Sequence, residues 1–248
     1  MSAKPLSRIY FPAGIPAHGR AELAPEQVHH ATRVLRLGPG DALTLFDGRG
    51  REFAARIARI SKSGVTIDVG ECRAVDRESP LAVTLAQAIS SGERMDYTVQ
   101  KAVELGTSLI QPLVTERGVV RLEPARASRR RAHWQSIAIA ACEQCGRNCV
   151  PPVAPIVALR DWLGGLGAGT SQRIVLSPRG ALALGALPAP GPGAILLAGP
   201  EGGLTAEEQR DAERHGFTAV RLGPRVLRTE TAAVAALAAM QALWGDFR

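Results

Sequence analysis

Lysine and long apolar runs are the two features that this sequence most clearly lacks. Only Lys4, Lys62 and Lys101 are lysines among 30 lysine and arginine residues. None stands in the pattern G-x-x-x-x-G-K-[ST], which excludes a Walker A phosphate loop. The longest apolar run, residues 232–240, is much shorter than the roughly 18 residues needed to span a bilayer, so we predict a buried helix there. The first residues also lack the apolar stretch of a secretory signal, so we expect a cytoplasmic protein with reduced cysteines.

Several catalytic and metal-binding signatures are missing as well. No G-x-G-x-x-G pattern follows a strand, and neither H-E-x-x-H nor G-x-S-x-G occurs, which disfavours a Rossmann dinucleotide site and hydrolase chemistry. The spacing of Cys142, Cys145 and Cys149 suggests a metal site, but Cys72 and the histidines are too distant in sequence to supply a fourth ligand readily. We therefore interpret Cys142 and Cys145 as small buried side chains on one helix face and predict no metal.

Positive charge is what the sequence has in excess. The formal net charge is +7 and the isoelectric point is near 9.9, which makes a polyanionic partner plausible. Part of the excess of arginine over lysine is also explained by a GC-rich coding bias. Between Arg117 and Arg131, however, six arginines face only Glu123, so this segment carries five of the seven net charges. Because like charges at this density repel one another, we expect RNA phosphate to neutralise them, although a solvated helix face is the simpler alternative.

Residues 1–73 are predicted to form a β-rich domain. Alternating apolar residues favour short strands at 8–11, 41–46, 53–60 and 65–69. Glycine-containing turns separate these strands, and one helix is expected over residues 25–35. The pattern is typical of a small barrel.

Residues 74–248 are predicted to form a second domain of the α/β class. Apolar strands expected at 81–89, 109–114, 173–176, 194–198 and 218–222 alternate with helical segments. The helices are expected from Met95 to Gly106, over residues 125–145, from Thr205, and over residues 231–244. Thr205 and Glu208 form a capping box that marks the start of the third of these helices. Strands that alternate with helices indicate a largely parallel sheet.

Two strand-to-helix loops are the strongest candidates for a binding site. Residues 199–205, GPEGGLT, follow an apolar strand and open the capped helix, at the edge of the sheet where α/β proteins bind ligands. Glu201, Glu207 and Glu208 crowd this helix start, which argues against a phosphate and for a neutral or cationic ligand. Residues 222–232, LGPRVLRTETA, form a second loop of similar design. A tight turn and an Arg228–Glu230 ion pair are the simpler explanations, but two such loops suggest one shared pocket.

These two loops resemble the paired signature of the RsmE family, bacterial methyltransferases of small-subunit ribosomal RNA in the SPOUT superfamily. Residues 101–106, KAVELG, and residues 143–147, EQCGR, also match, as do residues 29–37, Gly40, Asp41 and residues 46–48 of the first domain. The resemblance covers nearly the whole chain. It implies an N-terminal PUA-like β-barrel that binds RNA and a C-terminal SPOUT domain whose parallel sheet contains a trefoil knot. It also implies a homodimer, S-adenosylmethionine as cofactor, and methylation of N3 of a specific uridine in the 16S rRNA of the 30S subunit.

The resemblance further implies which residues bind the cofactor. Three loops are expected to surround it: Leu176, Ser177 and Pro178; Ala198, Gly199, Pro200, Glu201 and Gly203; and Leu222, Gly223, Val226, Leu227, Arg228, Thr231 and Ala232. A sulfonium cofactor is cationic, so it tolerates the acidic helix start that would repel a phosphate.

Candidate catalytic and RNA-binding residues complete the prediction. Arg8 and Arg228 are candidates to stabilise the anion that develops when uridine loses its N3 proton, and Glu230 is a weaker candidate for the base. The expected RNA contacts are arginines of the two domains: Arg8, Arg33, Arg36, Arg126, Arg129, Arg130 and Arg131. Two alternatives remain: another SPOUT methyltransferase, acting on ribose 2′-OH or another base, and a non-catalytic RNA-binding protein of ribosome assembly. Retention of both glycine-rich loops argues against the second.

Overall fold

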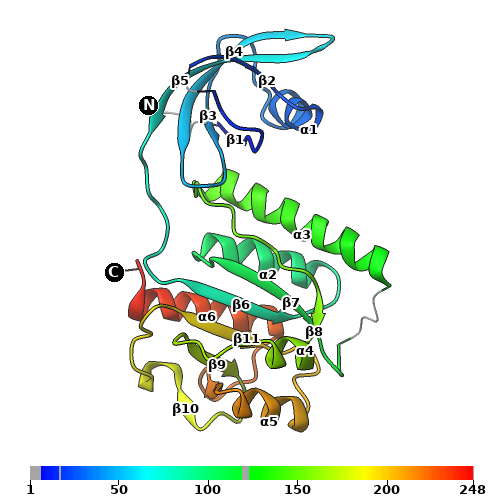
Figure 1. Cartoon of the computed structure of the whole chain (residues 1–248), viewed down its shortest axis with the longest axis vertical. Helices are drawn as coiled ribbons and strands as arrows, with labels where there is room; N and C mark the ends of the chain where they lie inside the picture. The colour runs from blue at the N-terminus through cyan, green and yellow to red at the C-terminus, as the bar shows by residue number, and fades with distance from the viewer. Residues whose placement is uncertain (1–6, 17, 119–122, 248) are drawn as a thin grey trace. The chain divides into compact units, whose positions relative to one another are not determined.

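The computed structural model describes residues 7–16, 18–118 and 123–247 (Figure 1). The chain divides into two compact units: unit 1 comprises residues 1–78 with 142–150, and unit 2 comprises residues 79–141 with 151–248. Residues 142–150 thus pack with the N-terminal part of the chain, whereas the sequence analysis assigned them to the second domain.

Unit 1 is built on a five-stranded sheet in the order β1-β3-β4-β5-β2. Its strands are β1 (Ser7–Tyr10), β2 (Gly19–Glu22), β3 (Ala42–Phe46), β4 (Glu52–Ser61) and β5 (Gly64–Arg73). All pairs are antiparallel except β1 with β3. Four of these strands were expected, and β2 was not. The strand is short and polar, and three of its four residues are exposed, so it carries no apolar alternation.

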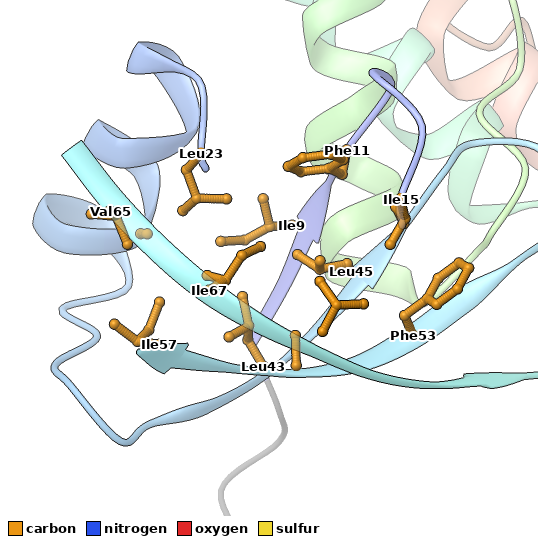
Figure 2. Close-up of a cluster of buried hydrophobic side chains, with 13 residues drawn as sticks. Ile9, Phe11, Ile15, Leu23, Leu43, Leu45, Phe53, Ile57, Val65 and Ile67 are labelled. Atoms are coloured by element: carbon orange, nitrogen blue, oxygen red, sulfur yellow. The ribbon is translucent and has the colours of Figure 1, made fainter. Parts of the chain in front are cut away.

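The core of unit 1 lies on one face of this sheet. Alternate residues of β1, β3, β4 and β5 point inward, and Figure 2 shows Ile9, Leu43, Leu45, Ile57 and Ile67 directed toward one another. The expected helix over residues 25–35 is present in two parts, α1 (Pro25–His29) and a single π-helical turn, η1 (His30–Val34). Arg36 follows with a φ of +54°. The sequence predicts a helical segment here but does not show that its second half is π-helical.

Unit 2 is built on a seven-stranded sheet in the order β10-β12-β9-β11-β6-β7-β8, and every pair in it is parallel. Its strands are β6 (Val83–Ala88), β7 (Leu109–Val114), β8 (Val157–Ala158), β9 (Gln172–Leu176), β10 (Leu182–Ala183), β11 (Ala194–Ala198) and β12 (Thr218–Arg221). The predicted parallel α/β sheet is therefore confirmed. Two-residue strands β8 and β10 were not expected, because they are too short to show a period.

Helices cover this sheet in unit 2. They are α2 (Glu93–Glu104), α3 (Pro124–Cys145), whose last turn belongs to unit 1, α4 (Leu159–Gly164), α5 (Ala206–Arg214) and α6 (Thr229–Trp244), with a short 3-10 turn η2 (Leu184–Ala186). Leu163 of α4 and Ala212 of α5 pack with Val175 and Leu197 in one core. Helices α2 and α6 pack against each other, and α6 contacts β11. The knot that the resemblance implies stays a prediction.

The junction of α2 and α6 contains a buried glutamine. Gln241 of α6 is 1% exposed, and its Nε2 donates to the carbonyl oxygen of Leu105 at the end of α2, at 2.7 Å. Gly106 follows with a φ of +79°, as expected of the residue after a helix end. A Cβ on Gly106 would lie 2.8 Å from Gln241 Nε2, so the close approach also requires glycine.

Candidate active site

A cavity of about 640 Å³ opens in unit 2 at the carboxyl edge of the parallel sheet. Strands β12, β9 and β11 are neighbours in this sheet, so the loops that follow them meet at the same edge. These loops line the cavity together with the start of α6. Such an edge is where open α/β sheets bind ligands, and the volume is in the range of small-molecule sites.

The structure brings the predicted cofactor-binding loops together around this cavity. All but one of the predicted residues line it: Leu176, Ser177, Pro178, Ala198, Gly199, Pro200, Glu201, Gly203, Leu222, Gly223, Val226, Leu227, Arg228 and Ala232. Thr231 is exposed on α6 and is not part of the lining described for the cavity. Glu230, the candidate base, lines it as well.

The loop after β11 is a tight turn fixed by backbone contacts. Gly203 has a φ of +67°, and its amide donates to the carbonyl oxygen of Pro200 at 2.8 Å. The capping box then starts α5, because the Thr205 hydroxyl accepts from the Glu208 amide and the Glu208 carboxylate accepts from the Thr205 amide. This confirms the predicted helix start. The Glu208 carboxylate also accepts from the amide of Glu116, so it is not available to a ligand.

A buried polar pair ties this loop to α6. The hydroxyl of Thr229 donates to the carbonyl oxygen of Gly199 at 2.6 Å, and the Nε2 of Gln87 donates to the Thr229 hydroxyl at 3.1 Å. Gln87 lies on β6 and is fully buried. Thr229 lies within the predicted loop at 222–232 but was not predicted as a site residue, and α6 begins at Thr229, two residues before the predicted start.

The carboxylate of Glu201 joins the same loop to the start of α2. Its Oε1 accepts from the amide and the hydroxyl of Ser91, both at 2.8 Å, and from Arg94 Nη1 at 3.0 Å. Partial burial opposes ionisation of Glu201, but the hydrogen bonds from Ser91, from its own amide and from Arg94 outweigh it. Together they lower the pKa of Glu201 from 4.5 to about 2. Glu201 is therefore a carboxylate at neutral pH.

Arg94 also lies near a second carboxylate of the cavity, that of Glu230. Arg94 Nε is 3.9 Å from Glu230 Oε1, and the side chain of Glu230 is 16% exposed. Its second oxygen, Oε2, is buried and accepts no hydrogen bond from the described residues. A buried carboxylate oxygen without a donor is costly unless a cation or donor binds to it, so Glu230 marks a place for a positively charged or proton-bearing ligand.

Arginines that the sequence analysis did not place at the site also line the cavity. Arg94 comes from α2, Arg117 from the loop after β7, Arg179 from the loop after β9, and Arg225 from the loop after β12. Arg225 was within a loop already singled out. Arg94 and Arg117 could only have been found through the sheet order, because they are more than 80 residues from Glu201 and Gly202, which they contact.

Arg8 lies elsewhere, in the interior of unit 1. Its Nη1 donates to Glu52 Oε2 at 2.8 Å and its Nη2 donates to Asn148 Oδ1 at 2.6 Å, while its guanidinium carbon lies 4.8 Å from the centre of the Phe46 ring. The side chain is 10% exposed. The catalytic and RNA-binding roles predicted for Arg8 stay predictions. In the structure, the groups that its guanidinium contacts belong to unit 1 itself.

The remaining predicted RNA-binding arginines lie mostly on the surface. Arg33 and Arg36 are exposed in unit 1, and Arg126 and Arg129 are exposed on α3 in unit 2. Arg130 is half-buried there, and Arg131 donates from Nε to the carbonyl oxygen of Val153 at 2.8 Å. Arg121, part of the same basic stretch, lies outside the described residues.

The cysteine cluster does not form a metal site in the described part of the chain. Cys142 is fully buried, and burial raises the pKa of its thiol to about 12. Among the residues that the structure describes, no group of three or more His, Cys, Asp and Glu side chains is placed to hold a metal ion. No described helix is long and apolar enough to cross a membrane.

Family models define the class of both parts of the chain. An RNA methyltransferase domain matches residues 77–241 and an RNA methyltransferase PUA domain matches residues 23–70. The first match includes the cavity and its loops, so the fold and the site are those of an RNA methyltransferase. At 34% identity over 245 residues, the chain is similar to ribosomal RNA small subunit methyltransferase E of Buchnera aphidicola, covering 99% of this chain and 96% of that protein. The chain belongs to the ribosomal RNA small subunit methyltransferase E family.

Other relatives and solved structures agree with this assignment. The enzyme of the same name from Bacillus subtilis is 34% identical and covers 87% of each chain. A ribosomal RNA small subunit methyltransferase E from Neisseria gonorrhoeae, crystallised with S-adenosyl methionine, has 45% identity and a TM-score of 0.93, covering 98% of this chain and 100% of that one. A methyltransferase from Legionella pneumophila with the bound cofactor SAM has 42% identity, a TM-score of 0.94 and the same coverage.

Proposed function

We propose that this protein transfers a methyl group from S-adenosylmethionine to N3 of a specific uridine in the 16S rRNA of the small ribosomal subunit. The observation that carries the proposal is the cavity at the carboxyl ends of β9, β11 and β12, inside the segment that matches an RNA methyltransferase domain. Similar structures with more than 40% identity were crystallised with this cofactor. The names of the relatives support the choice of small-subunit ribosomal RNA.

The residues of the cavity fit a sulfonium cofactor. Backbone groups of the glycine-containing turn at 199–203 are open to a ligand, and Leu222 and Leu227 supply apolar surface for an adenine ring. The carboxylates of Glu201 and Glu230 lie on the wall, and the unpartnered Oε2 of Glu230 suits a cation. When bound, S-adenosylmethionine supplies an electrophilic methyl group. The loops after β9, β11 and β12 would hold it.

The chain's own residues would act on the uridine. The base must leave its stack before N3 is exposed, and N3 must lose its proton for a methyl group to be accepted. The guanidinium of Arg228, exposed at the cavity, would stabilise the negative charge that develops on O2 or O4 of the base. The carboxylate of Glu230, which lines the cavity, would accept the proton. Arg8 was predicted to share the role of Arg228, and this stays a prediction.

The proposal includes how the protein binds RNA and assembles. The PUA-domain match supports RNA binding by unit 1, through exposed Arg33 and Arg36. Exposed Arg126 and Arg129 on α3 would bind RNA phosphates from unit 2. A homodimer acting in the cytoplasm, without a metal ion, completes the proposal.

Methyl transfer in a single turnover tests the proposal. Purified protein, saturating labelled S-adenosylmethionine and 30S subunits from a strain that lacks this protein are mixed, and the product nucleoside is identified by mass spectrometry. We expect N3-methyluridine in 16S rRNA, and we expect Arg228→Ala to slow its formation about 100-fold or more even when the cofactor is saturating. A ribose-methylated product would show that N3 of uridine is not the methyl acceptor. An unchanged rate for Arg228→Ala would show that Arg228 has no catalytic role.

A further inference from the structure

The lining of the cavity in unit 2 carries more positive charge than a cationic cofactor needs. Five arginines, Arg94, Arg117, Arg179, Arg225 and Arg228, face two glutamates, Glu201 and Glu230, a formal excess of three positive charges. S-adenosylmethionine carries a sulfonium, an ammonium and a single carboxylate, so its own negative charge accounts for one of these arginines at most. The excess therefore indicates a second, anionic ligand at the same cavity.

The positive charges are not distributed evenly around the cavity. Arg94 is bound by Glu201 at 3.0 Å and lies 3.9 Å from Glu230, so one arginine and both carboxylates form one group. Arg117 donates to the carbonyl oxygen of Gly202 at 3.1 Å, which leaves its charge uncompensated. Arg179, Arg225 and Arg228 are exposed, and their guanidinium groups form no hydrogen bond or ion pair with the residues that the structure describes.

These unneutralised arginines come from three different loops at one edge of the sheet. Arg179 follows β9, Arg225 and Arg228 follow β12, and Arg117 follows β7. Exposed guanidinium groups gathered from separate loops repel one another, and the cost is recovered when phosphate binds between them. A guanidinium also offers paired N–H donors that match two phosphate oxygens.

We propose that Arg179 and Arg225 bind the RNA phosphates on either side of the methylated nucleotide and hold the strand at the mouth of the cavity. The proposal rests on the proposed function, and it adds contacts that lie outside the PUA unit and outside α3. The acidic group of Glu201 and Glu230 would keep phosphates away from the inner wall, so that the base alone enters. Arg179 and Arg225 are then positioning residues that select the strand and its depth of entry.

The salt dependence of binding tests this assignment. Affinity for unmodified 30S subunits is measured by filter binding over a KCl series for the parent and for Arg179→Gln with Arg225→Gln. Each lost phosphate contact on a single strand should lower the slope of log K against log salt by about 0.7, so the double variant should lose roughly 1.4. Affinity for S-adenosylhomocysteine is measured for the same variants, and a loss there as large as the loss of RNA affinity would place the two side chains on the cofactor and overturn the proposal.

A matched control removes the same charge elsewhere in unit 2. Arg160→Gln with Arg210→Gln also removes two exposed arginines, neither of which lines the cavity, and it should leave the slope within experimental error. Arg179→Lys with Arg225→Lys keeps the charges and should restore the slope of the parent. If Arg179→Gln with Arg225→Gln gives the same slope as the control variant, the proposal is overturned.

A second copy of the chain is the alternative partner for Arg179 and Arg225 at the mouth of the cavity. Sedimentation of the parent and of the Gln double variant distinguishes it, because RNA-binding residues leave the oligomeric state unchanged. A change of oligomeric state with an unchanged salt slope would also overturn the proposal. Methyl transfer by the parent on the same 30S subunits tests the proposed function separately. If the salt-dependence test fails, the methyl-transfer test can still support the proposed function.

Discussion

Arg94 donates from Nη1 to Glu201 Oε1 across 3.0 Å and so joins the first turn of α2 to the turn between β11 and α5. The two residues are 107 positions apart in the sequence. Ser91 adds two further hydrogen bonds to the same oxygen, so a charged group joins the cavity loop to α2, while Leu204 packs the end of that loop against the core.

Replacement of this carboxylate should give a pH-dependent loss of stability. The pKa of Glu201 is lowered from 4.5 to about 2 in the folded state, so its contribution is complete above pH 4.5 and is lost as the pH falls toward 2. Because Glu201 is partly exposed, solvent screening limits the contribution to roughly 1–2 kcal/mol. Glu201→Gln should therefore lower the free energy of unfolding by about that amount at pH 7, and by less at pH 3, in urea titrations. Glu207→Gln, at an exposed glutamate of α5, is the control; an equal loss at both pH values would contradict the account.

The buried hydroxyl of Thr229 should matter more than its exposed neighbour Thr231. Thr229→Val keeps the shape of the side chain but leaves the carbonyl oxygen of Gly199 with only the long 3.5 Å contact from Gln87 Nε2. We expect a loss of about 1–3 kcal/mol in unfolding free energy and weaker binding of S-adenosylhomocysteine by calorimetry. Thr231→Val should change neither. Equal effects of the two variants would mean that the buried contact is not what fixes the loop.

Arg8 should contribute chiefly to the stability of unit 1. Removal of its guanidinium leaves Glu52, which is 4% exposed, with Arg77 as its remaining cationic partner, and leaves Asn148 Oδ1 without its donor. Arg8→Ala is therefore expected to lower thermal stability by several degrees and unfolding free energy by about 1–3 kcal/mol. Arg33→Ala, at an exposed position, should instead weaken RNA binding without a stability loss. If Arg8→Ala kept full stability and lost only methyl transfer, the result would support the predicted catalytic role of Arg8.

Gly106 should tolerate no side chain. A Cβ there would meet Gln241 Nε2 and Ser79 Cβ at 2.8 Å, and the φ of +79° is unfavourable for other residues. Gly106→Ala should cost about 1–3 kcal/mol in denaturant unfolding, because Gln241 must give up its bond to Leu105. Gly164→Ala, where a Cβ would meet nothing within 4 Å and φ is not positive, should be neutral or slightly stabilising. Similar losses at both glycines would show that the buried glutamine is not the cause.

Local signals in the sequence predicted most of the fold. The capping box at Thr205 and Glu208, the glycine after α2 and the parallel sheet were all confirmed, because each depends on a short pattern or on the alternation of strands and helices. The edge strand β2 was missed because its residues are polar and mostly exposed.

Contacts between distant segments could not be read from the sequence. Arg94 and Arg117 reach the cavity only because the sheet order places β7 and the start of α2 near the loop after β11. Arg8 is held by partners 44 and 140 residues away, so its burial could not be predicted from the alternation around it. The cofactor loops, in contrast, were predicted from the sequence, because their glycines and the apolar strands before them are neighbours along the chain.

Mass-spectrometric mapping of 16S rRNA from a strain that lacks this protein, compared with its parent, tests the central claim most directly. The account predicts that one N3-methyluridine present in the parent is absent from the mutant, and that it returns when the intact gene is restored but not with Arg228→Ala. A mutant that keeps every base methylation of the parent, or that loses a ribose methyl group instead, would contradict it.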